Sequence, residues 1–302
     1  MSKLFEESSI NGMTLRNRFV RAATWEGLAT PGGEATPKLI EMMAALARGG
    51  VGLIISSHSY VSPEGQGSPW QLGIYKDELI SKLRDLTSAV HENGGKMVMQ
   101  LGHAGHFAEE SLTGQAALAV SDFESLPGGP RKEITSLDIQ NLVFAYAQAA
   151  RRAGAAGFDG IEIHSGHGYL LSQFLSPAFN KRQDDYGGTI ENRTRIHILI
   201  YQAIRKLVGK DYPVFIKMNG ADFMEEGITV NDSLQAAKLF SQAGFDAIEV
   251  SGGIIRTGKL SPSRPGIHSN EEEAYFEDYA RKFRKEITSP IILVGGVRSF
   301  EV

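Results

Sequence analysis

Short apolar runs recur along the chain, and each is followed by a polar or glycine-rich loop and then by a helical pattern. The runs are continuous rather than alternating, which is typical of parallel strands covered on both faces. Strands that alternate with helices in this way predict an α/β protein with a parallel sheet. The predicted strands are residues 19–22, 51–55, 97–101, 160–164, 214–218, 247–251 and 291–295.

The helix before the fourth predicted strand shows its period clearly. Apolar residues recur at intervals of three and four from Ile139 to Ala153, so one face of the helix is expected to be buried. Thr135 and Asp138 have the spacing of a capping box, with Asp in place of the usual Glu or Gln. Gly154 is the predicted end of this helix.

One helix-to-strand junction is repeated within the chain. Residues 156–163 read AGFDGIEI, residues 243–250 read AGFDAIEV, and residues 47–55, ARGGVGLII, are a weaker copy. In each copy a helix ends, a glycine turns the chain and a strand begins. The repetition, without a break in composition, favours a single (β/α) barrel over two domains.

The two ends of the predicted barrel differ. Residues 10–18, INGMTLRNR, have a turn at Asn11 and Gly12 and predict a short hairpin that covers the bottom of the barrel. A TIM (β/α)8 barrel needs eight strands, and seven leave an open seam with unpaired edge groups. We therefore expect one domain over residues 1–302 that lacks the eighth βα unit at its C-terminal end, or else another element that closes the seam.

Composition and charge narrow the class of protein. Of the 302 residues, 42% are hydrophobic and 22% charged, and the formal net charge is -4, values of a soluble globular protein. The absence of a Lys/Arg-rich block argues against a nucleic-acid partner. No apolar run approaches the roughly 20 residues of a membrane span, and the N-terminus lacks a signal-peptide core, so a cytoplasmic location is expected. The chain has no cysteine, which excludes disulfides, thiol nucleophiles and iron–sulfur clusters.

Histidines gather where the predicted strands end. Because the carboxyl ends of parallel barrel strands share one mouth, where barrel active sites are built, these side chains are expected there. Six of the eight follow this rule: His58, His103, His106, His164, His167 and His268.

The loop after the fourth strand carries the strongest candidate chemistry. Neutral imidazoles of His164 and His167 can donate hydrogen bonds to a carbonyl or phenolate oxygen, and the Tyr169 phenol can donate a proton. The alternative is that Tyr169 and one histidine are buried and satisfied by backbone groups.

Three further positions suit a flavin. The Gln100 side-chain amide both donates and accepts, as the imide edge of a flavin requires, although it could instead cap a barrel layer. Lys217 lies at the end of a buried strand, where it either stabilises negative charge on a reduced flavin or extends to the rim. Gly295 and Gly296, followed by a helix N-terminus, suit a phosphate, although glycine pairs also serve as plain turns.

Four segments in this order, QLGHAG, HSGHGYLLSQFLSP, DDYGGTIENR and ILVGGVR, resemble the Old Yellow Enzyme family, in the bacterial branch close to the NADH:flavin oxidoreductases. The resemblance extends from residue 15 to the end of the chain. It implies a TIM barrel that binds FMN non-covalently at its carboxyl-terminal mouth. It also implies that NAD(P)H reduces the flavin and that hydride passes to the β-carbon of an alkene activated by a carbonyl group.

The resemblance assigns roles by position. It implies that His164 and His167 bind the substrate carbonyl oxygen and that Tyr169 donates a proton. Gly27 replaces a usual aromatic, which predicts a wider substrate pocket, and Arg256 lies in the loop expected to shape substrate choice. The implied FMN contacts are Ala23, Thr24, Trp25, His58, Gln100, Lys217, Gly295 and Gly296.

Some positions depart from the family pattern. Lys217 stands where arginine is usual, Trp25 where one branch has a redox-tuning cysteine, and His106 where an arginine is common. In the family the eighth unit supplies a Gly-Arg pair to the FMN phosphate, so a chain without that unit is expected to bind FMN weakly.

We interpret the chain as an FMN-dependent oxidoreductase that uses NAD(P)H to reduce enone-like small molecules, with no metal site and with a homo-oligomer left open. One alternative is a metal-dependent barrel hydrolase, in which His103 or His106 joins His164 and His167 as zinc ligands. Against it, the first strand does not end in His-x-His. The other alternative is a catalytically silent flavin-binding barrel.

Overall fold

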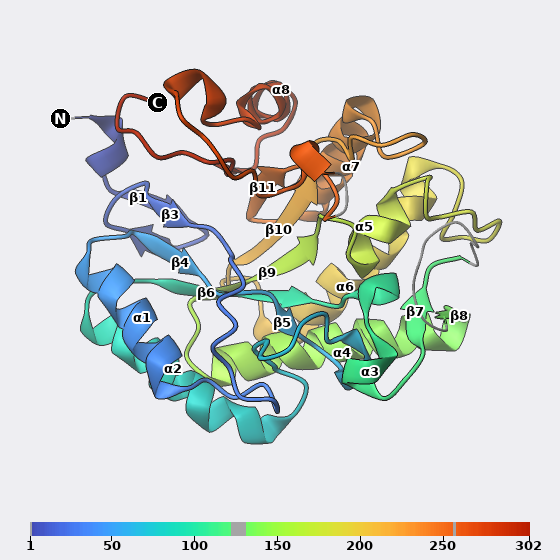
Figure 1. Ribbon diagram of the computed structural model, residues 1–302, viewed down its shortest axis with the longest axis horizontal. Helices are drawn as coiled ribbons and strands as arrows, with labels where there is room; N and C mark the ends of the chain where they lie inside the picture. Colours follow the sequence, from blue (N-terminus) through green and yellow to red (C-terminus); the bar gives the residue numbers. More distant parts are fainter. Residues whose placement is uncertain (1, 122–130, 256–257) are drawn as a thin grey trace.

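A curved parallel sheet forms the centre of the computed structural model, which describes residues 2–121, 131–255 and 258–302 (Figure 1). All seven predicted strands are confirmed, and a two-residue strand is added. The strands are β3 (Val20–Arg21), β4 (Leu53–Ile55), β5 (Ser59–Tyr60), β6 (Met97–Gly102), β9 (Gly160–Ser165), β10 (Val214–Asn219), β11 (Ala247–Ser251) and β12 (Ile291–Leu293). They pair in the order β12-β11-β10-β9-β6-β4-β3, and β5 pairs with β6 off this path.

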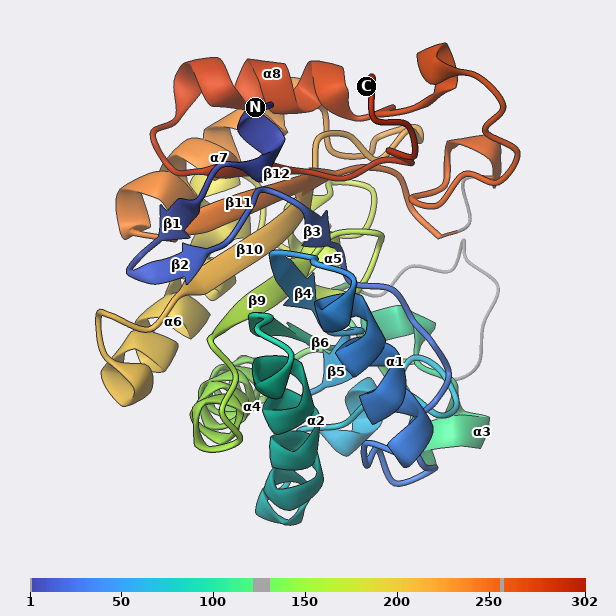
Figure 2. The same ribbon diagram turned by 90° about the vertical axis from the view of Figure 1, so that its left-hand side faces the viewer.

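Helices cover the outside of the sheet, as expected for a (β/α) barrel (Figure 2). The long helices are α1 (Pro37–Arg48), α2 (Ile80–Glu92), α4 (Ser136–Ala155), α6 (Ile190–Val208), α7 (Val230–Ala243) and α8 (Glu277–Glu286). The loops contain α3 (Glu110–Thr113), α5 (Leu170–Leu175) and a separate parallel pair, β7 (Ala117–Ala119) and β8 (Arg131–Glu133). Short 3₁₀ helices cover Lys3–Phe5, Pro63–Gly65, Asp77–Leu79, Gly105–Phe107, Gly258–Leu260 and Asn270–Glu272. Among the described residues, no helix is both long and apolar enough to cross a membrane.

The predicted capping box at the start of α4 is confirmed, but the predicted end is wrong. The backbone N–H groups of Thr135 and Asp138 each donate to the other residue's side chain. The helix runs past Gly154 to Ala155, and the chain reverses at Gly157, whose φ is 88°. Gly50 and Gly244, in the two other copies of the junction, have φ of 91° and 102°. Gly157, and not Gly154, is therefore the residue that needs the left-handed backbone that glycine permits.

The lower half of the barrel is apolar and is closed by the predicted hairpin, which pairs β1 (Ser8–Ile10) with β2 (Met13–Leu15). Met13 and Leu15 are buried against side chains near the amino ends of the strands. These side chains are Leu53, Ile55, Val98, Phe215, Ala247 and Ile292. The hairpin thus plugs the bottom of the barrel and leaves the carboxyl ends of the strands for the site.

The predicted seam lies between β3 and β12, where the hydrogen-bonded path ends in the described part of the chain. Both edges line a groove of about 750 Å³, together with Phe300 and Val302. The N-terminal segment (blue) and the C-terminal segment (red) lie close together here in both views (Figures 1 and 2), and the rings of Phe5 and Phe300 stack with centroids 5.8 Å apart.

Candidate active site

A cavity of about 670 Å³ opens at the carboxyl ends of the strands. Most of the sequence-predicted site residues line it together, although they come from six strands and their following loops. Those that line it are Ala23, Thr24, Trp25, His58, Gln100, His164, His167, Tyr169, Lys217 and Gly296. The structure therefore brings ten predicted positions to a single site, as parallel strands in a barrel require.

Two predicted glycines do not line the cavity, and one predicted residue cannot be placed. A Cβ on Gly27 would meet the indole ring of Trp25 at 3.3 Å, so that ring covers the position expected to widen the pocket. Gly295 packs against Phe276 and Tyr275, while Gly296 faces the cavity. Arg256 lies outside the described residues.

Three of the six histidines expected at the mouth lie elsewhere. His103 is buried, with its Nδ1 accepting from the backbone N–H of Gly105 and its Nε2 3.7 Å from a Glu64 oxygen. His106 packs against the rings of Phe107 and Phe179. His268 is exposed in the loop after β11. Their positions after strands predicted that these histidines would lie at the mouth. Local packing instead directs the side chains of His103 and His106 away from the cavity.

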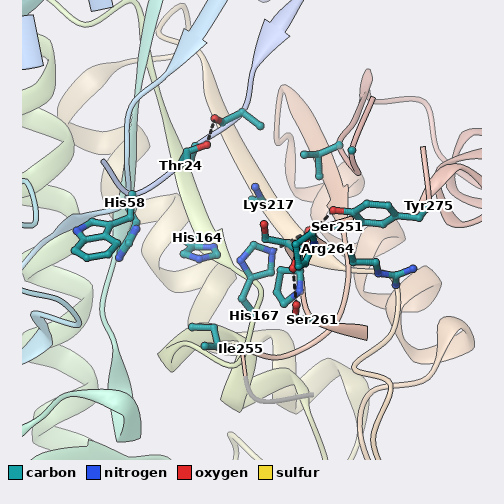
Figure 3. Close-up of a pocket in the computed structure, with 18 of the residues that line it drawn as sticks. Thr24, His58, His164, His167, Lys217, Ser251, Ile255, Ser261, Arg264 and Tyr275 are labelled. Atoms are coloured by element: carbon teal, nitrogen blue, oxygen red, sulfur yellow. Dashed lines mark hydrogen bonds between the residues drawn. The ribbon is translucent and has the colours of Figure 1, made fainter. Parts of the chain in front are cut away.

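The other three histidines, His58, His164 and His167, lie in a row in the cavity (Figure 3). The ring of Tyr169 packs beside His58 and His164. The ring centroids of His164 lie 6.3 Å from His58, 4.9 Å from His167 and 5.0 Å from Tyr169. The Tyr169 hydroxyl lies 3.5 Å from His58 Nε2. Hydrogen-bonding groups from the loop after β4 and from β9 with its following loop thus lie close together in the cavity.

Burial controls the protonation of this row. Burial, and then the charge of Lys217, lowers the pKa of His58 to about 4. The pKa values of His164 and His167 are lowered well below the usual value by the same main cause. Burial raises the pKa of Tyr169 to about 12. At neutral pH the site therefore holds three neutral imidazoles and a protonated phenol.

His167 is held in an uncommon backbone conformation. Its φ is 64°, and its backbone N–H donates to Asn219 Oδ1 at 3.1 Å. Its ring Nε2 lies 2.8 Å from Ser251 Oγ. Left-handed backbone at a non-glycine residue is strained and persists only where neighbours determine it, so Asn219 and Ser251 are structural supports of the site.

The cavity floor is polar, and its charges extend into the barrel. The Gln100 amide donates to Glu162 Oε2 at 2.6 Å, and Lys217 Nζ lies 3.0 Å from Glu249 Oε1. The continuous apolar runs predicted from sequence thus carry polar residues on the inner face of the barrel. The two glutamates were not identified as site residues. The sequence does mark them, because Glu162 and Glu249 occupy the same position in the repeats AGFDGIEI and AGFDAIEV.

The far end of the cavity is lined by residues that the sequence did not single out as cofactor contacts. Tyr275 and Arg298 lie there beside Gly296, and Arg264 comes from the loop after β11. The Arg264 guanidinium lies 4.3 Å from the centre of the Tyr275 ring. The cavity therefore has a polar floor at the strand ends and arginines at its outer end.

Comparison with known proteins decides the family. The family described as NADH:flavin oxidoreductase / NADH oxidase matches residues 3–301. The chain belongs to this family. The predicted Old Yellow Enzyme resemblance is confirmed by a solved family structure, the old yellow enzyme homologue from Zymomonas mobilis, with a TM-score of 0.83 and 26% identity. That match covers 99% of this chain and 83% of the solved chain, and it confirms the TIM-barrel fold class.

Two relatives in the NADH:flavin oxidoreductase family illustrate the range of lengths. The NADH oxidase of Thermoanaerobacter brockii is 36% identical over 303 residues, which cover 99% of this chain and 46% of that protein. The NADPH dehydrogenase of Geobacillus sp. (strain WCH70) is 38% identical over 260 residues, covering 85% of this chain and 75% of that protein. The chain thus spans about half the length of the first of these relatives.

Proposed function

We propose that the protein uses NAD(P)H and bound FMN to reduce the activated C=C bond of α,β-unsaturated carbonyl compounds. The observation that carries this proposal is the group of His164, His167 and Tyr169 along one wall of the cavity. Two neutral hydrogen-bond donors beside a protonated phenol suit a substrate whose oxygen gains negative charge while a neighbouring carbon takes a proton.

The donor set of the cavity fits FMN. The Gln100 amide and the Lys217 ammonium at the floor would hold the polar edge of the flavin ring, and the backbone of residues 23–25 would flank it. Gly296 and Arg298 would hold the phosphate at the outer end, where a cation and a small residue allow close approach. Bound FMN would accept hydride from NAD(P)H and supply it to the alkene.

The chain's own residues would bind and protonate the substrate. Neutral His164 and His167 would donate hydrogen bonds to the carbonyl oxygen, and burial strengthens such bonds. His164 Nδ1 is buried without a hydrogen-bond partner among the described residues. Tyr169 would deliver the proton, since its raised pKa keeps the phenol protonated throughout the neutral range.

The hydrolase alternative finds less support. It requires His103 or His106 beside His164 and His167, but neither His103 nor His106 lines the cavity. Among the described residues, no group of three or more His, Cys, Asp or Glu side chains could hold a metal ion.

The deciding experiment is an absorption spectrum of the purified protein after incubation with FMN and desalting. Retained flavin bands, followed by NAD(P)H oxidation that depends on cyclohexenone, would support the proposal. Retained flavin without cyclohexenone-dependent oxidation would favour a silent flavin-binding barrel. If desalting removes the flavin, fluorescence titration with FMN tests for weak binding, and the absence of saturable quenching would contradict FMN as its cofactor.

A further inference from the structure

Two glutamates face each other inside the barrel, directly below the cavity. Glu162 on β9 and Glu249 on β11 flank Lys217 on the intervening strand β10. The two glutamates are 0% exposed and Lys217 is 3% exposed. The two carboxyl groups are close enough for the charge of Glu249 to raise the pKa of Glu162. Two carboxyl groups and a single ammonium therefore share a space that water does not reach.

If both carboxyl groups are ionised, the cluster has more acceptor oxygens than the neighbouring hydrogen-bond donors can satisfy. Glu162 Oε2 accepts from Gln100. Glu249 Oε1 is paired with the Lys217 ammonium at 3.0 Å, while Glu162 Oε1 and Glu249 Oε2 have no hydrogen-bond partner in the described part of the chain. One proton between the two carboxyl groups would supply the missing donor and satisfy an oxygen on each side.

Charge leads to the same conclusion. Two carboxylates and one ammonium would leave a net negative charge in a dry interior, which is strongly unfavourable. The nearby titratable groups His58, His164 and His167 cannot compensate it, because burial keeps them neutral. Burial, and then the neighbouring charge of Glu249, raises the pKa of Glu162 well above its usual value.

We propose that Glu162 and Glu249 share a single proton, so that they form a neutral cluster with Lys217 and act as positioning residues for the cavity floor. Glu249 holds the Lys217 ammonium at 3.0 Å, and Glu162 holds the Gln100 amide at 2.6 Å. Each polar side chain of the floor is thus oriented by its own buried glutamate. The effect on bound flavin rests on the proposed function, whereas the shared proton does not.

The shared proton is tested by net charge in flavin-free protein. Native isoelectric focusing compares the parent with E162Q, E249Q and the surface control E92Q, in which an exposed glutamate at the end of α2 is replaced. The sequence pI is about 6.1, where an ordinary glutamate is ionised. We expect E92Q to focus at higher pH and E162Q and E249Q to focus with the parent, because each buried variant keeps one carboxylate and one ammonium. A shift of E162Q equal to that of E92Q would overturn the shared proton.

The positioning role is tested by the midpoint potential of FMN bound to the same proteins. E249Q removes the partner of Lys217, so its cation should favour the reduced flavin. We expect at least a tenfold rise in the ratio of affinities for reduced over oxidised flavin, which is about 30 mV for a two-electron couple. E162Q keeps the Lys217–Glu249 pair and an acceptor for Gln100, so its ratio should stay at the parent value. Equal shifts in the two variants, or none, would overturn the role of Glu249.

A second variant covers the case in which E249Q does not fold. K217Q/E249Q removes the cation and its partner together. Glu162 then keeps the proton, so no charge is left unpaired, and the same ratio should fall below the parent value. An unchanged ratio would overturn the positioning role. A parent that shows no saturable binding of FMN would contradict the proposed function, while the focusing experiment would still decide the shared proton.

Discussion

The ring Nε2 of His167 lies 2.8 Å from Ser251 Oγ, which ties the loop after β9 to the end of β11. The backbone N–H of His167 is held by Asn219 at the end of β10. One candidate catalytic side chain is therefore oriented by residues from two other strands. Its geometry is a property of the assembled barrel mouth rather than of its own loop.

Replacing Ser251 with alanine should loosen His167. Loss of one neutral hydrogen bond is worth about 1 kcal/mol, so binding of a phenol such as p-hydroxybenzaldehyde to the FMN-loaded protein should weaken about fivefold. S251T keeps the hydroxyl and serves as the control. Charge-transfer absorption on titration measures both affinities, and equal affinity of S251A and the parent would contradict the support role.

Replacing His164 with alanine should have a larger effect. If His164 donates directly to a phenolate oxygen, its loss removes a hydrogen bond to a charged group, worth about 1.5–3 kcal/mol. The phenol should then bind roughly 10- to 100-fold more weakly. H91A is a matched control, because His91 lies on α2 and pairs with Asp159 far from the cavity. An unchanged titration in H164A would remove the assignment.

Tyr169→Phe should separate the two half-reactions. Loss of the proton donor should slow alkene reduction by roughly 10²- to 10⁴-fold, the usual contribution of a positioned acid. Reduction of the flavin by NAD(P)H needs no proton from this phenol and should change little. Stopped-flow absorbance records the two rates separately. If both half-reactions slow equally, Tyr169 is not the donor.

Stability should decrease as the pH falls below the usual histidine value. The pKa of His58 is lowered from 6.5 to about 4 by burial, so between these values the unfolded chain binds the extra proton. Each such histidine then lowers the free energy of unfolding by up to about 1.4 kcal/mol per pH unit as the pH falls from 6.5 to 4. Urea unfolding across this window should show a shallower dependence for H58N. Parallel curves would mean that His58 titrates normally in the folded protein.

The two glycines at the end of α4 should respond in opposite directions to alanine. Gly157 has φ of 88°, and an added Cβ would lie 3.0 Å from Thr87 Oγ1, so G157A should lower stability by about 1 kcal/mol or more. Gly154 lies within the helix with nothing within 4 Å, so G154A should raise stability by about 0.5–1 kcal/mol. Equilibrium urea unfolding measures both. Destabilisation by G154A would show that Gly154, and not Gly157, ends the helix.

Local patterns were sufficient to predict the positions of the strands, the capped helix and the hairpin. Strand and helix periods arise from the repeat of the backbone itself, so they can be read from neighbouring residues. The same patterns misplaced the end of α4, because the choice between Gly154 and Gly157 depends on which residue must adopt positive φ. The residue with positive φ is set by the point at which the chain turns back from α4 to begin β9.

The sequence by itself determined that the barrel mouth would carry histidines, a tyrosine, Gln100 and Lys217, because parallel strands deliver their carboxyl ends to one side. Only the tertiary structure decided which of these residues face the cavity: His58, His164 and His167 do, while His103 and His106 are turned into packed surroundings. The pairing of Lys217 with Glu249 was also decided there. Direction and pairing depend on contacts between strands that are far apart in the chain, and the free energy of a buried charge is set by those contacts.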